Sequence, residues 1–210
     1  MSFRVGVLVS GEGSNLQALI DTVQAREGIE IVAVGSNNPD ARGLARAADA
    51  RIETGVFQAG SYGSREERDA ALGDWLADRR VDLVVLAGFM ELLGPAFVKR
   101  FAGRIINVHP SLLPAFPGVN PIDQALAHGV RLMGVTVHFV DEGVDSGPII
   151  LQEAFDPVTY SRDIAAVETR VHEIEHRLLP RAVRLIAAGR VRIDPANPRH
   201  VVVEEDDGNH

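Results

Sequence analysis

The sequence predicts an α/β fold built on a doubly wound, mostly parallel sheet, with an antiparallel strand pair toward the C-terminus. In the first half of the 210 residues, β-branched apolar runs alternate with segments whose apolar residues recur every three or four positions. Such alternation favours parallel strands covered by helices on both faces. Further along, two apolar runs follow each other with no helix between them, which predicts the antiparallel pair. The expected architecture is Rossmann-like, with a ligand site at the carboxyl ends of the strands.

The first elements are read from the hydrophobic pattern. Arg4–Val9 reads RVGVLV and stops at a serine and a glycine, as a strand buried on both faces does. A helix starting at Asn15 follows, because the apolar residues at positions 16, 19, 20 and 23 form one stripe. The next expected elements are a strand, a helix and a short strand over Ile29–Ser36, Gly43–Asp49 and Arg51–Phe57.

The middle of the chain contains the most hydrophobic strand. A helix is expected over Ser64–Arg80, because it opens with the capping-box pattern S-x-x-E. Val81–Ala87 (VDLVVLA) follows, and so apolar a strand belongs at the centre of a sheet. The elements after it are a short helix from Gly94, a strand over Arg104–Val108 and a proline-rich loop over His109–Asn120.

The last third predicts the antiparallel pair and a long helix. The pair is expected over Met133–Val140 and Ile149–Phe155, joined by a turn over residues 141–148. Ser161 is expected to cap a helix that reaches about Ala188, because apolar residues recur on one of its faces.

Composition excludes several classes of protein. We expect a single domain over residues 1–195 and a loose acidic tail over residues 196–210. With 29 acidic and 21 basic residues the net charge is -8, which disfavours nucleic acids and anionic membranes as partners. There is no cysteine, which excludes disulfides and thiol chemistry. No apolar run resembles a signal peptide or a membrane span, so a cytoplasmic location is expected.

A glycine-rich loop lies where the first strand becomes the first helix. Gly11, Gly13, Ser14 and Asn15 would let the free N–H groups of the helix approach a phosphate. Leu16 stands where a dinucleotide fingerprint has its third glycine, so a phosphomonoester fits better than NAD. The alternative is a plain tight turn in which Ser14 is the N-cap.

Two polar side chains close the strand over Arg104–Val108. Asn107 and His109 are two residues apart on extended backbone, so their side chains point the same way. An amide and a protonated imidazole that converge on one carbonyl would stabilise a tetrahedral oxyanion. A single histidine at a strand end is otherwise structural.

Asp145 is the candidate partner of His109. It lies between two glycines in the turn VDEGVDSGPI, and a carboxylate beside the imidazole would orient the ring. The alternative is an ordinary Asx turn. His138 is either a satisfied sheet histidine or a neighbour of this site. No metal site is expected, because His172 and His176 share a helix face without a third ligand.

Four segments carry a family resemblance over nearly the whole chain: SGEGSNLQALI, LAGFMELLGPAFV, RIINVHPSLLPAFPG and VHFVDEGVDSGPIILQ. In this order they resemble the phosphoribosylglycinamide formyltransferases, a folate-dependent family with the formyltransferase fold. Related enzymes that formylate methionyl-tRNA or hydrolyse formyltetrahydrofolate have an additional domain, for which 210 residues leave no room.

The resemblance implies transfer of a formyl group from 10-formyltetrahydrofolate, the co-substrate, to the amino group of glycinamide ribonucleotide in purine synthesis. It implies small-molecule partners only, no metal, and a monomer or a homodimer. The implied catalytic residues are Asn107, His109 and Asp145. The implied ribonucleotide-binding residues are Gly13, Ser14, Asn15 and Glu175. The implied folate-binding residues are Arg65, Met90, Glu91, Leu92, Leu93, Asn107 and Asp141.

Two positions depart from the family pattern, and two alternative functions stay open. The family usually has histidine in place of Asn120 and arginine in place of Glu91. An acid at position 91 would weaken binding of the anionic folate tail if its side chain faced that tail. The alternatives are a formyltetrahydrofolate hydrolase (deformylase) and a non-catalytic phosphate-binding Rossmann-like module.

Overall fold

The computed structural model describes residues 2–160 and 163–204. The strands are β1 (Phe3–Val9), β2 (Ile29–Ser36), β3 (Thr54–Val56), β4 (Leu83–Leu86), β5 (Ile105–His109), β6 (Met133–Phe139), β7 (Ile149–Phe155), β8 (Val191–Asp194) and β9 (Asn197–Val203). The helices are α1 (Ser14–Thr22), α2 (Arg42–Asp49), α3 (Arg65–Asp78), α4 (Pro95–Arg100), α5 (Pro121–His128) and α6 (Ile164–Ala187), with short 3₁₀ helices η1 (Ala59–Ser61) and η2 (Pro157–Tyr160).

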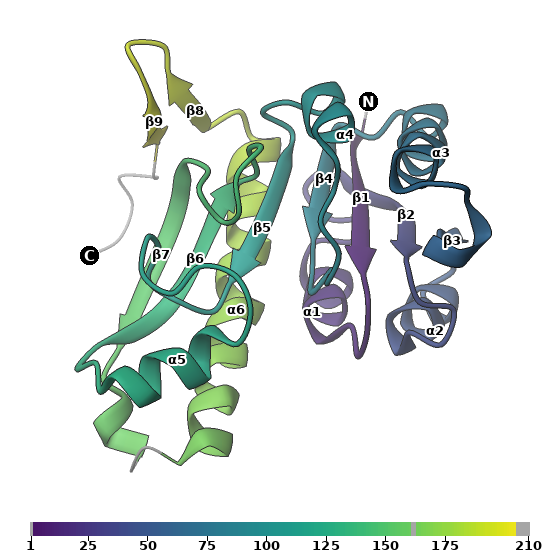
Figure 1. Cartoon of the computed structure of the whole chain (residues 1–210). Coiled ribbons are helices and arrows are strands. Elements are labelled where there is room, and N and C mark those ends of the chain that lie inside the picture. The colour runs from purple at the N-terminus through teal and green to yellow at the C-terminus, as the bar shows by residue number, and fades with distance from the viewer. Residues whose placement is uncertain (1, 161–162, 205–210) are drawn as a thin grey trace.

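The main sheet has the predicted topology. Its strand order is β3-β2-β1-β4-β5-β6-β7, and the first five of these strands are parallel (Figure 1). β6 is antiparallel to both β5 and β7, which confirms the predicted antiparallel pair. Because β1 lies between β2 and β4, the strand order reverses at β1 and β4. Ligands of such sheets bind at the carboxyl ends of the strands beside this reversal.

Two hydrophobic layers cover the sheet. Buried residues of α1, α5 and α6 pack on one face with Ala47 of α2, and buried residues of α3 and α4 pack on the other (Figure 1). All four residues of β4 are buried, and β4 occupies the middle position of the seven strands. This agrees with the prediction that the most hydrophobic run lies at the centre of the sheet.

Two elements differ from the sequence-based expectation. Helix α5 was not predicted, although Pro121 stands at its first position and Gly129 ends it in the left-handed conformation. The expectation of a loose tail from residue 196 is wrong for β9, which pairs with β8 as an antiparallel hairpin. Val201 and Val203 pack against the core and stabilise this hairpin. Ser161, the predicted cap of the last helix, lies outside the described residues, and Asp163 is the N-cap residue of α6.

Candidate active site

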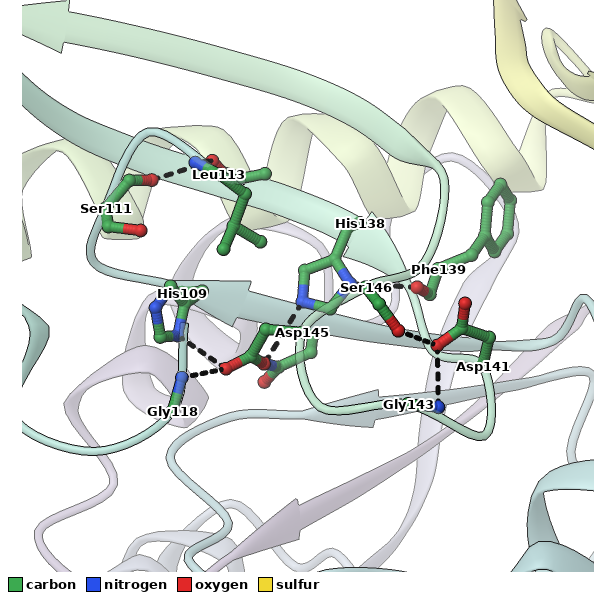
Figure 2. Close-up of polar contacts among 12 residues, drawn as sticks. His109, Ser111, Leu113, Gly118, His138, Phe139, Asp141, Gly143, Asp145 and Ser146 are labelled. Carbon is green, nitrogen blue, oxygen red and sulfur yellow. Dashed lines mark hydrogen bonds and ion pairs between the residues drawn. The ribbon is translucent and has the colours of Figure 1, made fainter. Parts of the chain in front are cut away.

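The carboxyl end of β5 carries Asn107 and His109, and the neighbouring strand β6 carries His138. The antiparallel register places Asn107 directly opposite His138. The Nδ2 atom of Asn107 lies 3.3 Å from the Nε2 atom of His138. This alignment brings three polar side chains together at the carboxyl end of β5, and Figure 2 shows those of His109 and His138.

Asp145 enters this group from the turn after β6. Its Oδ1 atom accepts a hydrogen bond from Asn107 Nδ2 at 3.3 Å, and its Oδ2 atom lies 3.4 Å from His109 Nδ1. The Gly118 N–H donates to the same Oδ2 atom at 2.8 Å, and His138 Nε2 lies 3.6 Å from Oδ1. The structure therefore brings Asn107 and His109, two of the three predicted catalytic residues, to the carboxylate of the third, Asp145. Figure 2 shows the contacts of His109 and Gly118 with it.

The turn that holds Asp145 is shaped by its own side chains and by a glycine. Asp141 Oδ1 accepts hydrogen bonds from the Gly143 N–H at 3.0 Å and from the Ser146 hydroxyl at 2.6 Å. A Cβ atom at Gly147 would lie 1.8 Å from the carbonyl oxygen of Phe139, so only glycine fits there. Asp145 itself has a left-handed φ of 49°, a conformation that aspartate tolerates better than most residues.

The surroundings of Asp145 favour its charged form. Burial by itself raises the pKa of this carboxyl group, but the interaction with His138, the Gly118 N–H and the neighbouring His109 together hold its pKa below the ordinary value of 3.8. Asp145 is therefore an anion at neutral pH. It faces His109 Nδ1, while His109 Nε2 lies 2.9 Å from the carbonyl oxygen of Phe116, so acceptors stand at both ring nitrogens.

A cavity of about 370 Å³ adjoins this cluster at the reversal of strand order. Its lining residues come from the segments at the ends of β1, β4 and β5, from the start of α1 and from α6: Ser10, Gly11, Glu12, Gly13, Ser14, Asn15, Ala87, Gly88, Met90, Val108, Pro110, His172 and Glu175. His109 lies between two of these residues, Val108 and Pro110. The catalytic candidates thus stand beside the cavity, although none of them lines it.

The glycine loop leaves the N-terminus of α1 open to a ligand. Gly13 is the N-cap with a left-handed φ of 71°, and no side chain caps this helix end. The alternative in which Ser14 is the N-cap is therefore wrong. A Cβ atom at Gly13 would lie 2.6 Å from the Cα atom of Gly43, so glycine is required there. Uncapped N–H groups at a helix N-terminus bind anions.

Asn15 and Glu175 form a buried pair on the wall of this cavity. Asn15 Nδ2 donates to Glu175 Oε2 at 2.9 Å. Burial raises the pKa of the Glu175 carboxyl group above 4.5, although the bond from Asn15 and the proximity of His172 oppose the shift. The Oδ1 atom of Asn15 is buried and has no hydrogen-bond partner among the described residues. It is an acceptor that is available to a ligand.

Comparison with known proteins decides the family. A model of the formyl transferase family matches residues 3–183. The chain belongs to the formyl transferase family. The resemblance inferred from its motifs is thereby confirmed.

Similar formyl transferases include free-standing enzymes and parts of larger proteins. Phosphoribosylglycinamide formyltransferase of Haemophilus influenzae is 43% identical, with 90% of each chain covered. A crystal structure of glycinamide ribonucleotide transformylase 1 from Symbiobacterium toebii is 44% identical with a TM-score of 0.91, covering 97% of this chain and 95% of that one. The trifunctional purine biosynthetic protein adenosine-3 of Drosophila melanogaster is 47% identical over 91% of this chain, which spans 14% of that longer protein.

The segment that the resemblance assigns to folate lies beside the cavity of this formyl transferase. Met90 and Leu92 are largely exposed, whereas Leu93 packs against the core. Arg65 does not line the cavity, but its Nε atom lies 3.9 Å from the position of a Cβ atom at Gly94, close to the end of this segment. The folate-binding roles of these residues, and that of Asp141, stay predictions.

Sequence reasoning missed several residues of the site. The sequence leaves the role of His138 open, because only the β5–β6 register places its side chain against Asn107. His172 lines the cavity, although it was considered only as a metal ligand. Arg68 pairs with Glu91, and the sequence gives no sign of this contact because Arg68 belongs to no recognisable motif.

Two searches of the described part of the chain were negative. No group of three or more His, Asp or Glu side chains there is arranged to hold a metal ion. No helix within residues 2–160 and 163–204 is long and apolar enough to span a membrane.

Proposed function

We propose that the chain transfers a formyl group from 10-formyltetrahydrofolate to the amino group of glycinamide ribonucleotide. The observation that carries the proposal is the convergence of Asn107 and His109 on Asp145, beside a cavity lined by an uncapped helix N-terminus. Membership of the formyl transferase family supports the reaction class. The substrate is supported by the similarity to phosphoribosylglycinamide formyltransferases over nine-tenths of both chains.

The ribonucleotide is proposed to bind with its phosphate on the free N–H groups of Gly13, Ser14 and Asn15. Its remaining polar groups then lie toward the pair of Asn15 and Glu175. Both side chains offer oxygen atoms, and the unpartnered Oδ1 atom of Asn15 requires a donor such as a hydroxyl or amine hydrogen. This placement directs the amine of the substrate toward Pro110 and hence toward the end of β5.

The folate is proposed to lie along Met90–Leu93. The exposed side chains of Met90 and Leu92 would be covered by its apolar rings. Arg65 is half exposed, and among the described residues it pairs with Glu66 alone, in a long 4.0 Å contact, so its guanidinium can attract a carboxylate of the folate tail. Asp141 holds the turn on which the pterin is proposed to rest.

The chemistry is addition of the amine to the formyl carbon, followed by elimination of the folate nitrogen as the C=O bond re-forms. The uncharged amine attacks that carbon, and the carbonyl oxygen becomes an oxyanion. In the proposed complex the oxyanion replaces the Phe116 carbonyl as the acceptor for His109 Nε2–H and also accepts from Asn107 Nδ2. One well-placed donor of this kind contributes about 3 kcal/mol. As the C–N bond to the folate breaks, the amine loses a proton and the departing folate nitrogen gains one. Asp145 orients the imidazole and accepts or relays this proton through water.

A single assay tests the proposal. Purified protein is incubated with 10-formyltetrahydrofolate in the presence and absence of glycinamide ribonucleotide, and the products are separated. We expect formylated ribonucleotide and tetrahydrofolate only when both substrates are present. Release of formate without the acceptor would identify a hydrolase, and absence of turnover with both substrates would leave a phosphate-binding module.

A further inference from the structure

A buried cation anchors the segment proposed to contact the folate. Arg68, in the first turns of α3, is only 2% exposed and is among the largest fully buried side chains. Its Nε and Nη2 atoms donate to Asp69 Oδ1 at 3.0 and 2.7 Å. Its Nη1 atom pairs with the Glu91 carboxylate, which lies at the centre of the Met90–Leu93 segment. The guanidinium of Arg68 thus pairs with two carboxylates, those of Asp69 and Glu91.

Hydrogen bonds fix both ends of this segment. Asp69 Oδ2 accepts from the Gly94 N–H at 2.6 Å. At the other end, the Met90 N–H donates to the Ser10 hydroxyl at 2.8 Å. The backbone beside Glu91 is therefore held on both sides.

The Glu91 carboxylate has a second partner that keeps it turned toward the protein. Asn37 Nδ2 donates to Glu91 Oε1 at 2.9 Å, and Asn37 Oδ1 accepts from the Ser10 hydroxyl at 2.6 Å. Each oxygen of Glu91 thus bonds to a group on another element. The side chain is nevertheless 31% exposed, so its charge would act on a ligand in the cleft if Arg68 did not balance it.

We propose that Arg68 is a positioning residue that allows an acidic residue to occupy the folate path. It holds the Glu91 carboxylate against α3 and offsets part of its charge, so that the anionic tail of the folate meets Arg65 with less repulsion from position 91. The inference rests on the proposed function, because it concerns the same folate-binding segment. The inference accounts for the departure from the family pattern at position 91, because a buried arginine 23 positions earlier in the chain, Arg68, pairs with the acid.

A merely structural role for Arg68 makes a different prediction. If Arg68 only stabilised the fold, its loss would affect both substrates and every folate alike. If it offsets the charge of Glu91, its loss must raise the KM for folate more when the tail carries more negative charge. The comparison of folates that carry one and three glutamates therefore separates the two roles.

The decisive variant is Arg68→Met, which keeps the aliphatic stem and removes the cation. We expect the KM for monoglutamyl formylfolate to rise by about fivefold and that for the triglutamyl form by more, while kcat and the KM for the ribonucleotide change by less than about twofold. Adding Glu91→Gln should restore the wild-type ratio of the two folate KM values. Arg80→Met, which removes an exposed arginine just beyond the same helix, is the matched control and should change neither KM value.

Equal effects on both folates, or no rescue by Glu91→Gln, would overturn the inference. If Arg68→Met does not fold by circular dichroism, Arg68→Gln decides, because its amide can still donate to Asp69 while the cation is removed. It should raise the KM for triglutamyl folate more than the KM for the monoglutamyl form, and equal rises would overturn the inference. Absence of transfer by the wild-type protein would refute the proposed function instead, so the two failures are distinguishable.

Discussion

Asp145→Asn tests the centre of the proposed mechanism with a minimal change in shape. In the wild type, Asp145 accepts from the Gly118 N–H at 2.8 Å and from Asn107 Nδ2 at 3.3 Å. The amide oxygen of the substituted asparagine can still accept one of these two hydrogen bonds. What is lost is the negative charge, which lies 3.4 Å from His109 and 3.6 Å from His138. The variant therefore separates the charge of Asp145 from its role in holding the loop.

The size of the effect follows from these distances. Two charges 4 Å apart attract by about 4 kcal/mol at an effective dielectric constant of about 20. The Asp145 side chain is 14% exposed, so little of that attraction is screened by solvent. Removing it from the transition state should lower kcat by about 10² to 10³-fold, or about 3 to 4 kcal/mol in the barrier. The KM for the ribonucleotide should stay within about twofold, because Asp145 does not line the cavity.

Thermal unfolding as a function of pH gives an independent measurement on the same variant. The pKa of Asp145 in the folded protein lies below its ordinary value of 3.8, so its charge stabilises the fold above that pH. This stability is lost as the pH falls through the lowered pKa. Asp145→Asn should therefore have a lower Tm than the wild type at pH 7, and the difference should shrink as the pH falls below 3.8 and vanish once the folded wild type is protonated at this position.

Asp123→Asn is the matched control, because it removes an exposed carboxylate from the first turn of α5. Steady-state assays with both substrates should give wild-type kcat for this control. A kcat for Asp145→Asn within about threefold of that of the control would refute the electrostatic role of Asp145.

Three further predictions concern the other parts of the site. His109→Ala should lower kcat by about 10²-fold or more with little change in the KM for the ribonucleotide, and an unchanged kcat would remove His109 from the mechanism. Gly11→Val should raise the KM for the ribonucleotide by about tenfold, because Gly11 lines the cavity and its Cβ position meets open space, so the bulkier side chain fits but crowds the ligand; a change in the KM for folate alone would contradict the phosphate site. Glu175→Gln should raise Tm at pH 8, since burial raises the pKa of Glu175 and its charged form costs stability as the pH rises above 4.5. That gain should disappear near pH 4, where the folded wild type is protonated at this position, and a gain that is constant with pH would contradict the assignment.

Local patterns were sufficient for much of the site. The side chains of Asn107 and His109 share one face because they are two residues apart on a strand, and that relation holds in any sheet. The glycine loop was recognised because a strand that ends in glycines before a helix leaves free N–H groups whatever surrounds it. The antiparallel pair and the central position of β4 follow equally from short-range hydrophobic pattern.

Other features needed neighbours that are distant in the sequence. The sequence pattern predicts a loose tail where the structure has the β9 strand of the β8–β9 hairpin. Its few valines form no recognisable strand pattern, and the hairpin is stabilised only when they pack on the core. Helix α5 was missed because a single turn of apolar residues after a proline-rich loop carries little periodic signal.

By itself, the sequence determines which residues can perform chemistry and which of them share a strand or a helix end, since backbone periodicity is a local property. The tertiary structure decides which distant charges meet. Asp145 contacts Asn107, 38 positions earlier, because β6 runs antiparallel to β5. Glu91 contacts Arg68 because α3 packs beside the end of β4. An electrostatic interaction depends on the distance between two groups in space and on their burial, and neither quantity is set until the chain has folded.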